Sequence, residues 1–281
     1  MASWCNTNFI GQSSNPLCYA KNLYLNNELV TSLIIPESVD SIKNYAFYNS
    51  SISSISIPNK VTSIGHNAFE ECSSLTSVYI SDVAAWCNIN FASYYSNPLC
   101  YAKNLYVNKE LITSLTIPES VNSIKQHAFY NSSLTSISIP NSVTSIGEWA
   151  FANCKALTSI TIPNSITSIG KDAFYYTLWL NNQPDGCIYI SKCLYSYKGE
   201  MPKHTHINIK EGTNQICESA FEECYNLTSI TIPNTVTSIE KGAFYGCYYL
   251  TLINVDKYNQ HYTSVDGALY TKDMKRLIYR P

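Results

Sequence analysis

The sequence predicts an α/β, mainly β, right-handed solenoid of about ten coils, each 22 or 23 residues long. A short apolar motif returns along the chain at this spacing, and self-similarity at a fixed short period is typical of repeat architectures. Each regular copy opens with alternating apolar and polar residues, which is the pattern of a half-buried strand. A proline follows most of these strands, and its missing N–H ends a strand.

The copy at residues 157–174 shows the expected elements of one coil in order. Residues 159–162 alternate and are rich in β-branched side chains, so they predict a short strand. Ile160 and Ile162 should point inward, and the polar residues between them should point outward. Pro163 should end the strand because it cannot donate to a strand ladder.

The return path of the same coil carries a second apolar set. Ile166 and Ile169 should face the core, and Gly170 should supply a turn that other residues would resist. Ala173 and Phe174 should form a short helical turn with the phenylalanine in the core. Coils stacked about 4.8 Å apart pair their strands in parallel. Each coil then buries roughly four to six large apolar groups, worth about 1.5–3 kcal/mol apiece.

The chain has 11 cysteines, so at least one has no partner within the chain. Four of them occupy one position of the repeat: Cys72, Cys154, Cys224 and Cys247. We expect these four to be buried thiols, because free cysteine is among the most buried residue types.

We expect residues 1–281 to form a single solenoid. Its departures from regularity are an 82-residue super-repeat in 4–147, an irregular coil at 178–206 and a terminal hairpin at 265–281. In the irregular coil, residues 187–197 alternate like one strand. In the super-repeat, residues 105–112 predict a tight hairpin, because asparagine in its turn tolerates positive φ.

Composition excludes several classes of protein. Only 14% of the residues are charged and the net charge is −2, so the footprint of a nucleic-acid-binding protein is missing. No apolar run reaches the ~18 residues of a membrane span, and the first residues lack the features of a signal peptide.

His204 and His206 lie two apart without further ligands nearby, so we expect no metal site. No cofactor motif or catalytic motif is present, so we expect a non-enzymatic protein.

The repeat Leu-Thr-Ser-Ile-Thr-Ile-Pro-Asn-Ser-x-Thr-Ser-Ile-Gly, followed by Ala-Phe and usually Cys, resembles the BspA-type (Treponema-type) leucine-rich repeat of surface proteins. The resemblance covers most of residues 30–80, 112–177 and 207–256. It implies a leucine-rich-repeat solenoid on the surface of host-associated bacteria or mucosal protozoa, with a role in adhesion. The family shares no catalytic residues. The chain reads as a section of a longer array.

Candidate binding residues lie on the outward side of the predicted strands, which form the concave face of such solenoids. They are Tyr79, Thr116, Thr161, Tyr189, His206, Asn208 and Thr231. Most outward positions are small hydroxyls, and these have a second interpretation: they suit a crowded parallel strand and hydrogen-bond along the ladder. The tyrosines of the inserts are likewise either contact residues or covers for the insert cores.

We therefore expect a non-catalytic protein-interaction module, an adhesin-like region at the cell surface or secreted as part of a longer protein. Its partner would be a protein ligand, such as a host matrix or cell-surface protein, or a glycan. The alternative is an intracellular leucine-rich repeat scaffold, and the oxidation state of the cysteines separates the two. The sequence leaves the ligand, the source and the oligomeric state open.

Overall fold

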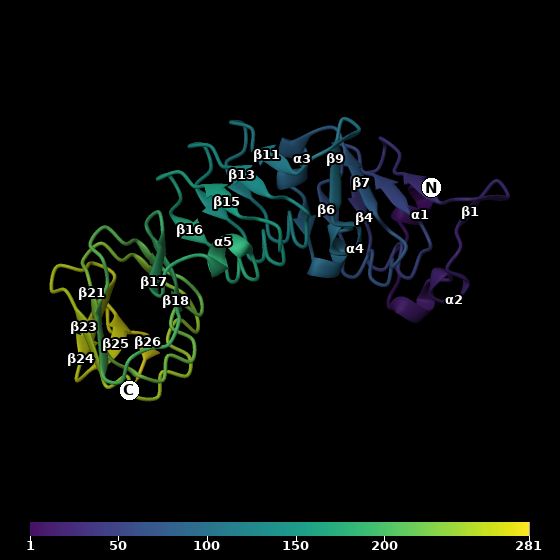
Figure 1. Ribbon diagram of the computed structural model, residues 1–281. Helices are drawn as coiled ribbons and strands as arrows, with labels where there is room; N and C mark the ends of the chain where they lie inside the picture. Colours follow the sequence, from purple (N-terminus) through teal and green to yellow (C-terminus); the bar gives the residue numbers. More distant parts are fainter. Residues whose placement is uncertain (281) are drawn as a thin grey trace. The chain divides into compact units, whose positions relative to one another are not determined.

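The computed structural model describes residues 1–280 (Figure 1). Contacts divide the chain into two compact units. Unit 1 comprises residues 1–161 and 172–182, and unit 2 comprises residues 162–171 and the described residues from 183 onward. Both units consist of stacked coils, about ten in all, so the predicted solenoid fold is confirmed.

Unit 1 holds short helices and many short strands. Its elements are α1 (Ala2–Cys5), η1 (Gln12–Ser14), α2 (Leu17–Ala20), β1 (Tyr24–Leu25), β2 (Glu28–Leu29), β3 (Ser32–Ile34), β4 (Ser41–Ile42), β5 (Ser54–Ser56), β6 (Ser63–Ile64), β7 (Ser77–Ile80), α3 (Val83–Cys87), β8 (Asn90–Phe91), η2 (Tyr94–Ser96), α4 (Leu99–Ala102), β9 (Asn104–Val107), β10 (Glu110–Leu111), β11 (Ser114–Thr116), β12 (Ser123–Ile124), β13 (Ser136–Ser138), β14 (Ser145–Ile146), β15 (Ser159–Thr161) and α5 (Leu178–Asn181).

Unit 2 is built from strands. They are β16 (Ser168–Ile169), β17 (Gly186–Ile190), β18 (Cys193–Lys198), β19 (Thr205–Asn208), β20 (Gln215–Ile216), β21 (Leu227–Ile232), β22 (Ser238–Ile239), β23 (Leu252–Val255), β24 (Tyr262–Val265), β25 (Ala268–Thr271) and β26 (Leu277–Tyr279).

Two rows of strands run through each unit. Most of the front strands precede the repeat proline. They are β3, β5, β7, β9, β11, β13 and β15 in unit 1, and β19, β21 and β23 in unit 2. The rear strands lie on the return path and include β4, β6 and β8 of unit 1 and β20 and β22 of unit 2. Neighbouring front strands pair in parallel and in register, so Ser32, Ser54 and Ser77 align.

A column of phenylalanine rings fills the space between the two rows. Phe129, Phe151 and Phe174 stack with ring centroids 5.4 and 5.5 Å apart, and all three side chains are fully buried. Ile137, on the front strand β13, is buried against the same core, as expected for an inward position. These columns confirm which residues of the repeat face inward.

The Ala-Phe segments form hydrogen-bonded turns rather than helix, and a ladder of backbone bonds links each turn to the next coil. We call it the turn ladder. The N–H of the phenylalanine donates to the carbonyl of the alanine in the following coil. The N–H of the residue two positions after the phenylalanine donates to the carbonyl of the residue two positions after that alanine. In unit 1 these bonds are Phe47 to Ala68, Asn49 to Glu70, Phe129 to Ala150, Asn131 to Ala152, Phe151 to Ala173 and Asn153 to Tyr175, at 2.8–2.9 Å.

In the first segment of each 82-residue repeat, a tryptophan and an asparagine side chain donate hydrogen bonds to the alanine carbonyl of an Ala-Phe turn. Trp86 Nε1 donates to the Ala128 carbonyl at 2.8 Å, and Asn97 Nδ2 donates to the same oxygen at 3.0 Å. The corresponding bonds recur 82 residues earlier in the chain, from Trp4 and Asn15 to the Ala46 carbonyl. Side-chain donors thus take the place of the backbone donors that a preceding regular coil would supply.

The repeat glycine serves close packing rather than a left-handed turn. A Cβ on Gly147 would lie 2.3 Å from the Gln126 backbone nitrogen, and a Cβ on Gly65 would lie 2.5 Å from the Asn44 nitrogen. The positive φ of the turn falls elsewhere, for example at Trp149, where φ is 55°. The turn role predicted for this position is therefore wrong for both glycines.

The four cysteines of the repeat column are buried, as predicted. The thiols of Cys72, Cys154 and Cys247 each donate a hydrogen bond, 3.0 Å long, to a phenylalanine carbonyl of the preceding coil. Burial raises the pKa of the Cys72 thiol to about 12 and that of Cys154 to about 11. These thiols stay protonated at neutral pH and are expected to be unreactive.

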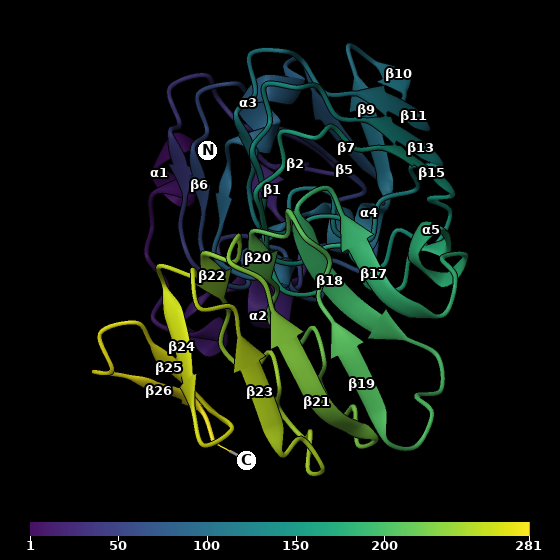
Figure 2. The ribbon, with the colours of Figure 1, turned by 90° about the vertical axis from the view of Figure 1, so that its left-hand side faces the viewer.

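The irregular coil differs from the prediction. Residues 186–198 form an antiparallel hairpin, because Ser191 at its turn adopts a φ of 52° and the chain reverses there. The second strand, β18, then pairs in parallel with the rear strand β20 (Figure 2). Residues 187–197 are therefore two strands, and they do not join the front sheet of β19, β21 and β23.

The C-terminal segment forms a three-stranded antiparallel sheet of β24, β25 and β26 rather than a hairpin alone. Residue 281, the end of the predicted hairpin, lies outside the described residues. The sheet packs on the coil before it: the Tyr279 ring lies 5.6 Å from Phe244, and the Tyr262 hydroxyl accepts the Ile239 N–H at 2.9 Å.

Candidate functional site

The structure separates the predicted binding residues into four places. Tyr79 lies on β7, Thr116 and Thr161 lie on β11 and β15, Tyr189 lies on β17, and His206, Asn208 and Thr231 lie on β19 and β21. All except Tyr189 occupy the solvent side of front strands, which we call the front face. Tyr189 belongs to a different sheet.

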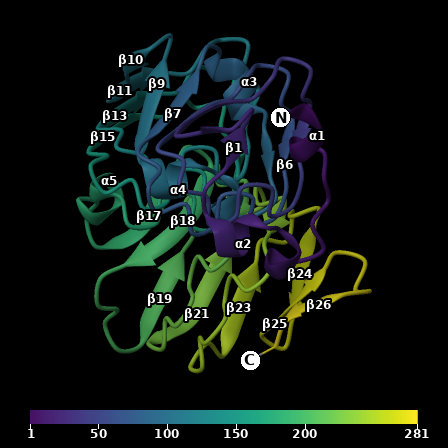
Figure 3. The same cartoon turned by 90° about the vertical axis from the view of Figure 1, so that its right-hand side faces the viewer.

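Tyr79 is part of an aromatic pair. Strands β7 and β9 lie side by side (Figure 3). Their parallel register aligns Tyr79 with Tyr106, and the two rings stack with centroids 4.7 Å apart. Offset stacking of this kind is favourable beyond the area that it buries. The pair forms a half-exposed aromatic platform on the front face of unit 1.

A groove of about 690 Å³ lies along this platform. Its lining includes Ile34, which is 71% exposed, together with Ser56, Tyr79 and the turn residues Asn108 and Lys109. The volume falls within the roughly 300–1,000 Å³ of ordinary ligand pockets. An exposed isoleucine beside a tyrosine pair gives this groove the apolar centre and polar margin typical of recognition sites.

The hydroxyls of the same sheet bond to one another. Ser54 Oγ donates to Ser32 Oγ at 2.9 Å, along the ladder direction. The same pairing occurs between Ser136 and Ser114 at 2.7 Å, on the sheet that carries Thr116 and Thr161. Part of the hydroxyl column therefore stabilises the strands. Thr116 and Thr161 lie in register on that sheet, and the front face of β11, β13 and β15 carries no aromatic residue beside them.

In unit 2 the structure brings His206, Asn208 and Thr231 together. His206 Nε2 lies 3.0 Å from Asn208 Oδ1, and His206 Nδ1 contacts the hydroxyl of Ser229 on the neighbouring strand. Asn208 and Thr231 are aligned partners of β19 and β21. The imidazole is exposed, and contacts at both ring nitrogens hold it in place, so the ring presents a fixed polar surface.

Tyr189 has a structural role. Its hydroxyl accepts the Lys210 N–H at 3.1 Å, and its ring packs against the core cluster of unit 2. Burial raises the pKa of its phenol above the ordinary value. Its predicted place in the front column is wrong because the hairpin turn at Ser191 redirects the strand.

The insert tyrosines form a chain of ring contacts on the turn side of unit 1. Tyr94 lies 5.6 Å from Tyr130, and Tyr130 lies 6.1 Å from Trp149. His127 is only 8% exposed beneath these rings, and its Nδ1 has no partner among residues 1–280. Burial lowers the pKa of His127 to about 4.

Among residues 1–280, no cluster of three His, Cys, Asp or Glu side chains could hold a metal ion. The only approach to a catalytic arrangement that we found on the front faces is the Ser229–His206–Asn208 contact. It lies on the edge strand β19 and its neighbour β21.

The described residues contain no helix with the length and apolar character of a membrane span.

Sequence reasoning missed Tyr106 as a front-face residue and placed it only in an insert. A signal was present: residues 104–107 repeat the alternation of residues 77–80, 27 positions later. That spacing exceeds the regular 22 or 23, so the sequence predicts a hairpin of the insert at residues 105–112 and not a front strand.

The family model of the BspA type leucine rich repeat region matches residues 19–101, 100–198 and 190–273 of this chain. Three solved structures are similar. A leucine-rich repeat protein from Eubacterium ventriosum is 22% identical, with a TM-score of 0.35. A leucine rich cell surface protein from Faecalibacterium prausnitzii is 27% identical, with a TM-score of 0.37. A leucine-rich repeat protein from Bacteroides ovatus is 22% identical, with a TM-score of 0.35.

The matches cover 73%, 79% and 81% of this chain, respectively. The chain spans 44% of the Eubacterium protein, 69% of the Faecalibacterium protein and 61% of the Bacteroides protein. No curated protein matches the chain.

Proposed function

Because this chain belongs to the BspA-type leucine-rich repeat family, we propose that it is a non-catalytic protein-interaction module whose front faces carry the binding surface. Leucine-rich repeats suggest protein interaction as a class. The observation that carries the proposal is the groove beside the Tyr79–Tyr106 platform. Tyrosine is enriched among the residues that dominate binding energy in interfaces.

Each face contributes a different chemistry. Tyr79 supplies aromatic area in unit 1, and Thr116 and Thr161 supply hydroxyls on the next sheet. His206, Asn208 and Thr231 supply hydrogen-bonding groups in unit 2. The low charge of the chain, 14% of residues, favours a partner recognised by shape and hydrogen bonds over one recognised by charge.

The finer proposal is an adhesin-like role at the cell surface or in a secreted protein, with a host matrix protein, a cell-surface protein or a glycan as partner. What supports it is the family, together with the small share of charged residues and the tyrosine-lined groove. We further propose that residues 1–281 act as one solenoid.

Binding of the full chain to immobilised fibronectin, collagen, laminin and mucin tests this proposal. Tyr79→Ala and Tyr106→Ala should each weaken binding at least tenfold, because truncating an interface aromatic costs about 2 kcal/mol or more. The matched control is Tyr24→Ala, the repeat equivalent of Tyr106, which lies 82 residues earlier and is not part of the stacked pair. Equal affinity of all three variants, or no binding to any of the four proteins, would contradict the proposal.

An intracellular scaffold is the second candidate function. The observation in its favour is that all 11 cysteines, which lie within residues 1–280, are free thiols. Disulfides persist in oxidising compartments and are rare in the cytosol. Mass spectrometry of the protein isolated from its source under alkylating conditions separates the candidates: a disulfide in the mature protein would eliminate the scaffold.

A further inference from the structure

The turn ladder of unit 2 ends at Gly242–Gly246 with donors that have no acceptor. In the coil before, the Phe221 N–H donates to the Ala243 carbonyl and the Glu223 N–H donates to the Tyr245 carbonyl, both at 2.8 Å. The equivalent donors of the next turn are the N–H groups of Phe244 and Gly246. Neither has a hydrogen-bond acceptor among residues 1–280.

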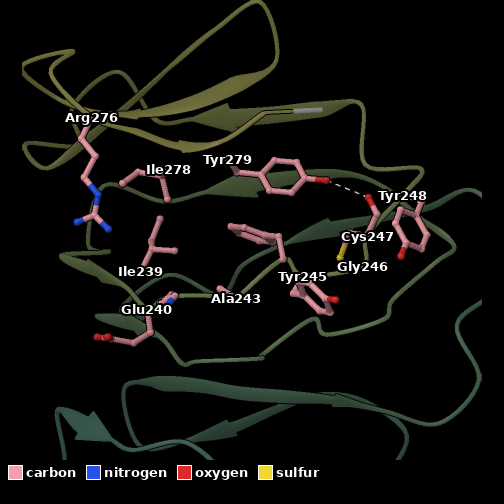
Figure 4. Close-up of a pocket in the computed structure, with 13 residues that line it drawn as sticks. Ile239, Glu240, Ala243, Tyr245, Gly246, Cys247, Tyr248, Arg276, Ile278 and Tyr279 are labelled. Atoms are coloured by element: carbon pink, nitrogen blue, oxygen red, sulfur yellow. Dashed lines mark hydrogen bonds between the residues drawn. The ribbon is translucent and has the colours of Figure 1, made fainter.

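The two residues that carry these donors line a pocket. A cavity of about 390 Å³ is lined by Phe244 and Gly246, by Ile239 of the last rear strand, and by Ile278 and Tyr279 of β26 (Figure 4). Tyr279 covers part of Phe244, and its hydroxyl donates to the Cys247 carbonyl at 3.0 Å. The terminal sheet therefore covers the aromatic end of the turn and leaves the two backbone donors beside an apolar space.

The chain itself shows what fits beside such donors. In the regular coil pairs, the occupant is a tripeptide of the next Ala-Phe turn: one carbonyl accepts from the phenylalanine N–H, the next side chain enters the core, and the following carbonyl accepts from the second N–H. Ala243, Phe244 and Tyr245 fill these three roles for the coil before. An unmet pair of buried or half-buried donors favours the same kind of occupant, since unpaired backbone groups are costly.

We propose that this pocket, the turn slot, binds a peptide segment of a partner protein that adopts the same turn conformation. Carbonyls i and i+2 accept from Phe244 and Gly246, and an apolar side chain at i+1 enters the space between Ile239 and Ile278. Recognition continues the backbone ladder of the solenoid, in the way that strand addition extends a sheet edge. The slot lies on the turn side of unit 2, apart from the His206–Asn208 front face, so it is a second binding surface.

Charge contributes little to the slot. Its charged lining residues are Glu240, Lys241 and Arg276, and Glu240 Oε1 already accepts from Ser238 at 2.6 Å and from Gln215 at 3.2 Å. Peptide binding should therefore change less than about threefold between 50 and 500 mM salt, because main-chain hydrogen bonds carry no net charge to screen.

Amide NMR of the full chain tests the proposal. The probe is the capped hexapeptide Glu-Trp-Ala-Phe-Ala-Asn, the sequence of residues 148–153, which presents both carbonyls of the ladder within its own coil. The Phe244 and Gly246 amides should shift in a saturable way, while the Phe221 and Glu223 amides, already bonded, should stay in place. The same peptide with aspartate in place of phenylalanine should bind at least tenfold more weakly.

A matched pair of variants locates the site. Ile278→Trp should fill the slot and weaken peptide binding at least tenfold, whereas Leu277→Trp, its exposed neighbour on β26, should bind like the unmodified chain. The titration of the unmodified chain decides the proposal even if Ile278→Trp fails to fold. Unmoved Phe244 and Gly246 amides at millimolar peptide, or equal shifts at Phe221 and Glu223, would overturn it.

Discussion

Phe151 shows at the scale of one residue what holds a coil in place. Its ring is fully buried between those of Phe129 and Phe174, and its N–H donates to the Ala173 carbonyl at 2.8 Å. Side chain and backbone of one residue thus contact the coils on both sides. Ser159, on the front face of the neighbouring strand, is exposed.

Phe151→Ala should lower the free energy of unfolding by about 3–5 kcal/mol, as truncating a buried aromatic does. Ser159→Ala should change it by less than about 0.5 kcal/mol, as a surface substitution. Urea unfolding of both variants measures the difference. Equal losses would show that the inward and outward columns are assigned wrongly.

His127 is a second residue with a measurable consequence. Burial lowers its pKa from 6.5 to about 4, so the folded state keeps the ring neutral over a pH range in which the unfolded chain binds a proton. The stability that the neutral ring contributes is present above pH 6.5 and is lost as the pH falls toward about 4. At about 1.4 kcal/mol per pKa unit, the full loss is on the order of 3 kcal/mol.

His127→Asn should remove this part of the acid sensitivity, because asparagine does not titrate and tolerates the φ of 59° at this position. Stability curves of the variant and the unmodified chain between pH 7 and pH 4 should converge toward low pH. His66→Asn, at an exposed position of an equivalent turn, is the control and should leave the pH dependence unchanged. Parallel curves for His127→Asn would contradict the account.

At the scale of the element, a coil is defined by how closely its backbone approaches the previous coil. Gly147 and Gly65 are required because another backbone occupies the place of a Cβ. The turn ladder then fixes the Ala-Phe segment, and the insert residues Trp86 and Asn97 replace its donors at the start of a regular stretch.

Gly147→Ala should destabilise the protein by about 1–3 kcal/mol, since the new methyl group would meet backbone atoms that cannot move independently. Gly11→Ala is the control: nothing lies within 4 Å of its Cβ position, and its φ of −163° is extended backbone. That change should stay within about 0.5 kcal/mol. Thermal melts of the two variants compare them, and a tolerated Gly147→Ala would refute the close approach.

The sequence predicts the regular parts of these elements well and the irregular parts poorly. The Ile and Phe columns, the cysteine column and the hairpin turn at Asn108 and Lys109 follow from periodicity and from turn chemistry, and the structure confirms them. The reversal at Ser191 could not be predicted, because a serine in the left-handed region leaves little signal in the sequence.

The residues of the candidate site likewise differ in how far the sequence alone predicts their positions. Tyr79 could be placed on the front face from alternation alone. Its partner Tyr106 carries the same alternation, but the stacked pair also depends on which strand lies beside β7, and that is a long-range property of the insert. The exposure of Ile34 and the burial of His127 likewise depend on neighbouring segments rather than on their own sequence context.

At the scale of the whole chain, stability of stacked coils is approximately a sum of coil terms and nearest-neighbour terms. Interfaces between coils then decide how the chain opens, and loss of one interface weakens its neighbours. The front faces take their rigidity from this stacking, since the front strands that carry Tyr79 and His206 pair with the strands of neighbouring coils.

Amide hydrogen exchange of the turn ladder tests the stacking most directly. The amides of Phe47, Phe129, Phe151 and Phe221 each donate to the next coil, so they should exchange at least on the order of a thousandfold more slowly than in an unstructured peptide. Exchange of these four amides at the rate of free peptides would show that the coils do not pair backbone to backbone, and the solenoid account would be wrong.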